Sequence, residues 1–286
     1  MQTRVPWWLR LYLLIAAAQA LVYGASGFLM PLRGLPGLRI ALFLSAVSAR
    51  FTGALYLTLA LSLILAAFVQ SARDTRIFVI GLAVTAGMTL SVTLLHWREF
   101  SLESSRYLWA GTYGAHLLIA LCVWLWLNRH VEPLPPPRTA PSLFQIEGLL
   151  LGSIGLLLLF LPGYAILLWP WKIVAVEAGF YACFFIALAT VAALAAREPG
   201  SPDGRSFSIT SLGFAAFVLI ASIQDFDSLK PGASAWIWYG VLGLAIIAFT
   251  WDLFHPSPNS ETRALSNGQN DRSARGQHDP RPEPHR

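Results

Sequence analysis

The sequence predicts an all-α integral membrane protein. Its composition, the lengths of its apolar stretches and the placement of its tryptophans support this fold. Hydrophobic residues make up 56% of the 286 residues and charged residues only 12%. An average soluble domain has about twice that charged share. A soluble chain of this size could not bury so much apolar surface, so most of that surface must face lipid.

Eight apolar stretches are long enough to cross a bilayer, which takes about 20 mostly apolar residues. Helices are expected because an open strand in hydrocarbon would leave its backbone polar groups unpaired. The stretches cover about 8–30, 51–70, 77–96, 107–127, 148–169, 173–196, 207–223 and 235–254. All eleven tryptophans fall near the ends of these stretches or between them. That placement is typical of the aromatic belts at membrane interfaces.

The second half of the chain repeats the first. Four segments match in order: 28–31 with 159–162, 76–80 with 205–209, 97–102 with 224–229, and 107–109 with 236–238. The offset between paired residues stays between 127 and 131. Because four helices are an even number, the sequence predicts two tandem repeats in the same orientation, related by an axis along the membrane normal. The predicted organisation is a first repeat at 1–130, a linker at 131–141, a second repeat at 142–255 and a tail at 256–286.

The repeat also moves one predicted boundary. If Pro162 corresponds to Pro31, the fifth helix covers about 142–161, and Gly163 to Trp171 becomes a connector. The equivalent connector of the first half contains an apolar segment at 38–44, which is too short to span and should lie in the interface or dip into it.

Basic residues indicate the orientation. The N-terminus, the connectors on its side and the tail carry 13 of the Lys and Arg residues, and the opposite connectors carry seven. The positive-inside rule then predicts that both termini lie in the cytoplasm. The tail is polar and rich in Pro, Ser, Asn and Arg, so we expect it to be disordered. Five of the arginines lie in this polar tail, and the net charge of +5 indicates no nucleic-acid partner. Cys122 and Cys183 lie in separate spans at different depths, and we expect both to be free.

Two segments, Ala49–Leu57 and Leu94–Phe100, resemble parts of uncharacterised bacterial polytopic membrane proteins. The resemblance covers the first half of the chain and implies no activity, cofactor or functional residue.

His116 is the one histidine at mid-span and the candidate cofactor ligand. A neutral imidazole with small residues beside it would suit haem or chlorophyll. A second histidine at the same depth, which a bis-histidine haem needs, is missing. The alternative is a histidine that hydrogen-bonds to a neighbouring helix.

Arg50 and Glu177 open the second and sixth predicted helices at equivalent places in the two repeats. We expect them to form a structural ion pair near the outer face. The alternative is that each side chain extends separately to the headgroups.

A second group of ionisable residues gathers at the same helix ends. Their side chains are of the types that bind a divalent cation, and they form a candidate metal site: His96, Glu99, Asp225 and Asp227. The alternative is a set of loop charges without a ligand.

The chain contains no zinc-protease, phosphate-loop or nucleophile-elbow motif, which argues against an enzyme. The sequence therefore favours a non-catalytic subunit or scaffold that packs against other membrane proteins in the bilayer. A small-solute transporter or channel is one alternative, and a haem- or pigment-binding protein that uses His116 is the other.

The predicted orientation can be tested by thiol labelling in intact cells. A cysteine at Ser266 in the tail should resist a membrane-impermeant reagent, whereas a cysteine at Ser228 should react, because only the second faces outward. The reverse pattern would refute the orientation.

Overall fold

The computed structural model describes residues 5–31, 45–69, 72–99, 103–131, 143–197 and 202–255, and within these ranges it is all-helical. Eight of the described helices are long and apolar enough to cross a membrane. This confirms a multi-pass membrane protein that contacts the lipid bilayer. The predicted segment 38–44, the linker from 132 onwards and the tail 256–286 lie outside the described residues.

The helices follow the predicted stretches closely. The α-helices are α1 Trp7–Leu29, α2 Ala46–Phe68, α3 Ala72–Leu95, α4 Glu103–His130, α5 Leu143–Phe160, α6 Pro162–Leu168, α7 Ala175–Ala195, α8 Pro202–Gln224 and α9 Ala233–Phe254. Two short 3₁₀ turns, η1 Trp97–Glu99 and η2 Phe226–Ser228, follow α3 and α8. The start of α5 at Leu143 agrees with the boundary that the repeat indicated and not with a start at 148.

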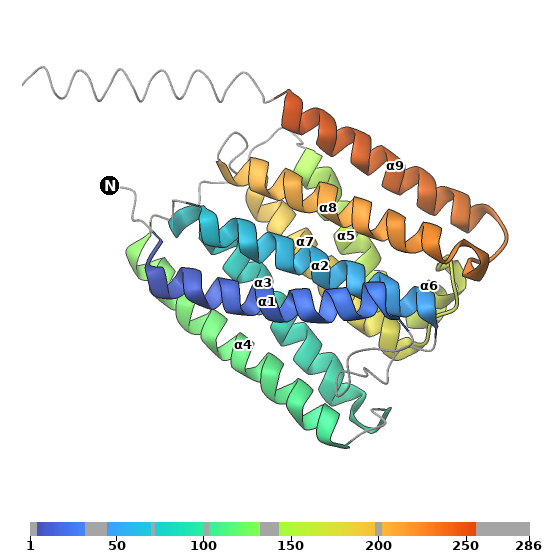
Figure 1. The fold of residues 1–286 in the computed structure, drawn as a ribbon, viewed down its shortest axis with the longest axis horizontal. Coiled ribbons are helices and arrows are strands. Elements are labelled where there is room, and N and C mark those ends of the chain that lie inside the picture. Colours follow the sequence, from blue (N-terminus) through green and yellow to red (C-terminus); the bar gives the residue numbers. More distant parts are fainter. Residues whose placement is uncertain are drawn as a thin grey trace, which may run out of the picture.

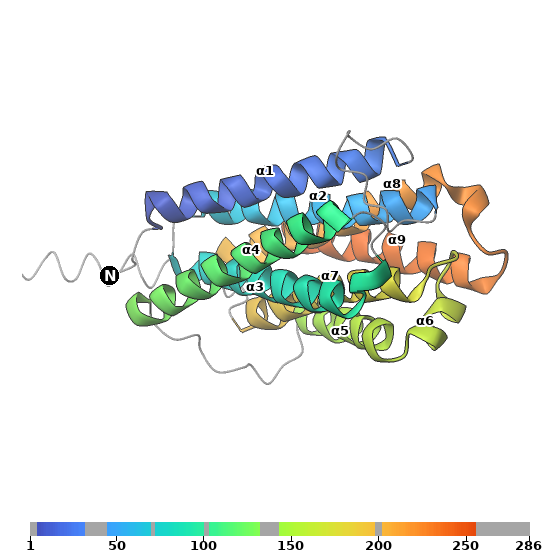
Figure 2. The same ribbon diagram turned by 90° about the horizontal axis from the view of Figure 1, so that it is seen from below.

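The bundle has an inner and an outer set of helices (Figures 1 and 2). The inner helices α2, α3, α7 and α8 are 50–67% buried within the chain over their apolar windows, and the outer helices α1, α4, α5 and α9 only 11–33%. Each outer helix packs mainly on one inner helix: α1 on α2, α4 on α3, α5 on α7 and α9 on α8. Among the inner helices, α2 packs on α8 and α3 packs on α7. The described chain begins and ends at the same end of the bundle (Figure 1).

Glycines bring α1 and α2 into close contact, as is common between helices in lipid. A Cβ atom added to Gly53 would come within 2.8 Å of the Gly24 carbonyl oxygen and within 2.9 Å of the Gly27 carbonyl carbon. A Cβ at Gly27 would lie 2.8 Å from the Ala49 carbonyl oxygen. The obstacles are backbone atoms, so they cannot turn aside as a side chain would.

Pro162 separates α5 from α6, because proline has no N–H for the helix to continue with. The short helix α6 is then fixed by the connector before α9. The Lys230 ammonium donates to the Ile166 carbonyl oxygen at 2.7 Å, and the Lys230 backbone N–H donates to the Pro170 carbonyl oxygen at 2.7 Å. A cation at a helix C-terminus also complements the helix dipole.

An aromatic cluster fills the same end of the bundle. Phe51 at its centre is fully buried. Its ring centroid lies 4.7–6.4 Å from those of five other aromatic residues: Trp169, Trp171, Tyr181, Phe185 and Trp238. Several of these pairs are edge-to-face, a favourable arrangement for aromatic rings. The cluster joins three helices, α2, α7 and α9, to the segment that follows α6, and it closes this end of the core.

Replacing Gly53 by alanine should destabilise the protein by about 1–3 kcal/mol, the usual cost of overpacking, because the added methyl group meets backbone on α1. Gly243→Ala is the control, since a Cβ there meets nothing within 4 Å. That change should be neutral or slightly stabilising. Thermal unfolding in detergent micelles would measure both, and equal midpoints for the two variants would contradict the close packing of α1 on α2.

Candidate functional site

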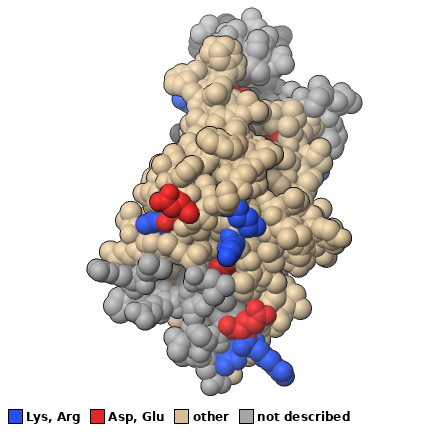
Figure 3. All heavy atoms as spheres, turned by 90° about the vertical axis from the view of Figure 1, so that its right-hand side faces the viewer, with Lys and Arg blue, Asp and Glu red and all other residues tan. Residues whose placement is uncertain are grey.

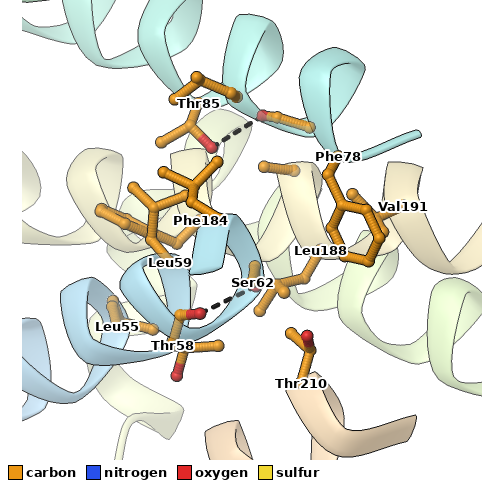
Figure 4. A pocket seen from close by; sticks show the side chains of 14 residues that line it. Leu55, Thr58, Leu59, Ser62, Phe78, Thr85, Phe184, Leu188, Val191 and Thr210 are labelled. Carbon is orange, nitrogen blue, oxygen red and sulfur yellow. Dashed lines mark hydrogen bonds between the residues drawn. The ribbon is translucent and has the colours of Figure 1, made fainter. Parts of the chain in front are cut away.

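A cavity lies among the four inner helices. The side chains around it come from α2, α3, α7 and α8, and Figure 4 shows them converging on one space. Labelled examples are Thr58, Thr85, Phe184 and Thr210. The cavity leaves about 30 Å³ for the centre of a water molecule. That is room for about two waters.

The lining of this central cavity is hydroxylated and uncharged. Four of its residues carry hydroxyl groups, and the others are apolar. The four hydroxyl residues are Thr58, Ser62, Thr85 and Thr210. Each hydroxyl donates to the backbone carbonyl one helical turn earlier, at 2.8–3.0 Å. Each oxygen keeps lone pairs that can accept a hydrogen bond. The cavity can therefore receive donors from a small polar molecule.

The cavity lies near the middle of the predicted membrane. Thr58 and Thr85 are close to the midpoints of α2 and α3. Other lining residues, such as Phe78 and Val191, lie nearer the end that carries the chain termini. The aromatic cluster around Phe51 lies towards the opposite end. The central cavity thus extends from the middle of the predicted membrane towards the terminal end of the bundle.

A second, smaller cavity lies among the first four helices, with about 20 Å³ for the centre of a water molecule. Its polar lining residues are Gln19, Tyr23, Tyr56, Thr85, Thr112, Tyr113 and His116. The buried hydroxyls of Tyr56 and Tyr113 hydrogen-bond to each other. The two cavities share four lining residues, Leu59, Leu63, Leu82 and Thr85. They are therefore neighbours separated by side chains of α2 and α3.

His116 is hydrogen-bonded to a neighbouring helix, one of the two arrangements the sequence allowed. Its Nε2 lies 2.8 Å from Gln19 Oε1, and its Nδ1 lies 3.4 Å from the Tyr12 hydroxyl. Both partners are on α1. A haem iron or a chlorophyll magnesium would need the lone pair of one ring nitrogen, so its binding would displace at least one of these contacts. Haem or pigment binding at His116 stays a prediction.

Arg50 has an acidic partner, Asp225 at the end of α8, and the two side chains form an ion pair. This follows from the packing of α2 on α8. Glu177 is fully buried at the start of α7, where its Oε2 accepts the Val174 backbone N–H at 3.1 Å. One turn further, the Tyr181 hydroxyl donates to the Ser48 carbonyl at 3.4 Å, so the two helix starts are close. The pair of Arg50 with Glu177 stays a prediction.

The candidate metal ligands are only partly brought together. His96 Nδ1 lies 2.7 Å from Glu99 Oε1, whereas Asp225 turns to Arg50. Within the described residues no group of three or more His, Cys, Asp or Glu side chains could hold a metal ion. The physical reason is that α3 packs on α4 and α7, while α8 packs on α2 and α9. Among the expected ligands His96, Glu99, Asp225 and Asp227, the described structure thus forms one His–Glu contact, and Asp225 pairs with Arg50. A metal site built from these four residues stays a prediction.

Charged groups are sparse on the end of the bundle that carries α6. Figure 3 shows this face as mostly uncharged, with small groups in which acidic and basic side chains adjoin. The two cysteines are free, as expected, with Cys122 exposed and Cys183 buried.

Two intramembrane carboxyl groups escaped the sequence analysis. On α8, Ser211 donates to Glu147 Oε2 on α5 at 3.0 Å, and Ser208 donates to Asp252 Oδ2 on α9 at 2.6 Å. Glu147 falls inside the stretch 142–161 that the predicted repeat indicated, so the sequence already placed this carboxyl group within a predicted span. The hydroxyls of the central cavity were missed as well, although Thr58 and Ser62 have the four-residue spacing of one helix face.

Comparison of the chain with protein-family models, with curated proteins and with solved structures finds no match.

Double-mutant cycles can separate the two possible partners of Arg50. For Arg50→Gln with Asp225→Asn we expect a coupling of about 1–3 kcal/mol, between the values of exposed and buried pairs, because this pair is only partly exposed. The same cycle with Glu177→Gln tests the predicted pair. Unfolding in detergent micelles gives the free energies. Additive effects in the Glu177 cycle would refute the predicted pair, and additive effects in the Asp225 cycle would contradict the observed one.

Proposed function

We propose that the chain is a small-solute transporter or channel built from two four-helix repeats. The packing pattern supports the repeat: exchanging α1–α4 with α5, α7, α8 and α9 maps the main contacts among these eight helices onto one another. The α1–α2 contact corresponds to the α5–α7 contact, and the α3–α4 contact corresponds to the α8–α9 contact. The α2–α8 contact corresponds to the α7–α3 contact. The 3₁₀ turns η1 and η2 also follow corresponding helices. A polar site at the centre of these contacts is a feature that transporters and channels need and scaffolds do not.

The central cavity carries this proposal. In transporters made of repeats, the substrate site lies near the bilayer midplane at the repeat interface. The cavity has that position, because α2 and α3 come from the first proposed repeat and α7 and α8 from the second. Four hydroxyls in an apolar wall also match the usual composition of a small-molecule site.

The lining restricts the solute to small neutral molecules. None of the lining residues is charged. An ion placed there would lose its hydration without gaining a partner of opposite charge, which is expensive at membrane depth. The solute class we propose is a small uncharged molecule with hydrogen-bond donors, such as water, urea or a polyol. We further propose that both termini are cytoplasmic, as the basic residues predict, and that the membrane is a bacterial plasma membrane, as the resemblance to bacterial membrane proteins indicates.

The role that the sequence favoured, a subunit packed against other membrane proteins, is the second candidate, and α9 is the observation in its favour. Large apolar side chains cover one stripe of this helix and are exposed: Ile237, Val241, Leu244, Ile247, Trp251 and Phe254. Only 11% of its apolar window is buried within the chain. A stoichiometric second chain in mass spectra of the gently solubilised protein would support this role.

Transport can be tested in proteoliposomes by stopped-flow light scattering under glycerol and urea gradients. Thr58→Val with Thr210→Val removes two hydroxyls of the central cavity while keeping the side-chain shapes. Each lost hydrogen bond costs about 1 kcal/mol, and about 1.4 kcal/mol is tenfold in rate. We therefore expect the flux of the transported solute to fall about tenfold or more.

Thr190→Val is the matched control. Its hydroxyl donates to the Ile186 carbonyl in the same way, at 2.8 Å, but it does not line the central cavity. Its flux should equal that of the unchanged protein. Fluxes no greater than those of protein-free liposomes, or equal losses in the control, would contradict the proposal.

A further inference from the structure

Polar side chains lie between α1 and α4 at mid-membrane depth. The two helices lie side by side (Figures 1 and 2), yet α1 packs mainly on α2 and α4 on α3. They meet through long side chains. Gln19 and Tyr12 from α1 contact His116 from α4, and Trp8 meets Trp126 with ring centroids 5.3 Å apart. Gln19 and His116 are close to the midpoints of their helices.

These polar groups are only partly covered. Tyr12, Gln19, Thr112 and His116 are all half-buried, so part of each side chain is accessible from outside the bundle. Hydrocarbon at this depth contains no water to complete their hydrogen bonds. Polar groups in such a position are costly, and an ionisable residue at this depth, here His116, is a candidate functional residue. The arrangement therefore calls for an occupant with polar atoms that arrives through the bilayer.

The smaller cavity lies directly behind this contact. His116, Gln19 and Thr112 line it, and so do the rings of Tyr23, Tyr56 and Tyr113. The Tyr23 and Tyr56 ring centroids are 5.5 Å apart. Aromatic walls favour a flat ring, while the imidazole, amide and hydroxyl groups supply hydrogen-bond donors. No charged residue lines the cavity.

We propose that the gap between α1 and α4 is a lateral entrance to a binding site for a neutral, lipid-soluble ring that carries carbonyl oxygens, of the quinone type. His116, Gln19 and Tyr12 form the mouth, and His116 and Gln19 donate hydrogen bonds to a ring carbonyl that displaces the Gln19–His116 contact. In the present conformation the cavity holds about one water, so the Gln19 side chain swings aside as the ring enters.

The proposed repeat indicates that the site is specific to the first half of the chain. The residues that correspond to Gln19 and His116 in the second half are Leu150 and Ala245, by the offsets of 131 and 129. The second half folds into the same helix pattern with apolar residues at these places. A leucine at Gln19 or at His116 should therefore be tolerated by the fold.

The experiment is isothermal titration calorimetry of the full chain in detergent micelles. The probe is 2,3-dimethyl-1,4-naphthoquinone, whose substituted ring carbons do not alkylate the exposed Cys122. The matched probe 2,3-dimethylnaphthalene has the same ring shape without carbonyl oxygens. We expect saturable binding of one quinone per chain and only micelle partitioning of the hydrocarbon. His116→Leu and Gln19→Leu should each weaken quinone binding at least tenfold.

His130→Leu is the control variant. His130 lies at the end of the same helix, where its Nδ1 contacts the Trp126 carbonyl oxygen at 2.8 Å outside the cavity. Quinone affinity should be unchanged in this variant, and thermal unfolding checks that all variants fold. The inference is overturned by absence of saturable quinone binding, by equal binding of the hydrocarbon, or by unchanged affinity in His116→Leu. The glycerol and urea flux assay probes Thr58 and Thr210, which do not line this smaller cavity, so the two proposals fail independently.

Discussion

The structure depends on one constraint: a hydrocarbon environment offers backbone and side-chain polar groups no partner outside the protein. Long helices satisfy this constraint for the backbone. Inside the bundle, threonine and serine hydroxyls meet it by donating to carbonyls of their own helix, as Thr58, Thr85 and Ser222 do. Longer polar side chains must cross to another helix, so each polar contact between helices also fixes a packing arrangement.

Composition and hydropathy were enough to predict the eight helices that are long enough to span, because spanning length and lipid exposure leave little choice of secondary structure. The short helix α6 lies where a connector was expected. The predicted repeat gave a better boundary than hydropathy for the fifth helix, since α5 begins at Leu143 and ends at Phe160, just before Pro162. Side-chain partners were harder to predict. Arg50 meets Asp225 because α2 packs on α8, and the spacing of residues along one chain does not determine which helices adjoin.

The candidate sites show the same limit. His116 stood out in the sequence because a histidine at mid-span is rare, but its partners on α1 follow only from the packing of the first four helices. The central cavity was not predicted, since its hydroxyls are individually ordinary and become a site only where α2, α3, α7 and α8 converge. Glu147 was overlooked although the redrawn helix included it. Its serine partner sits on α8, more than sixty residues away.

The division into inner and outer helices determines which motions are inexpensive. Displacing α8 disturbs its interfaces with both α2 and α9, whereas displacing α9 disturbs mainly the interface with α8. The same holds for α1, which rests mainly on α2. The four inner helices therefore form the more rigid core, and each outer helix can move with the loss of mainly one interface. Local rearrangements begin at the lipid-facing perimeter, while the hydroxyl-lined centre keeps its shape.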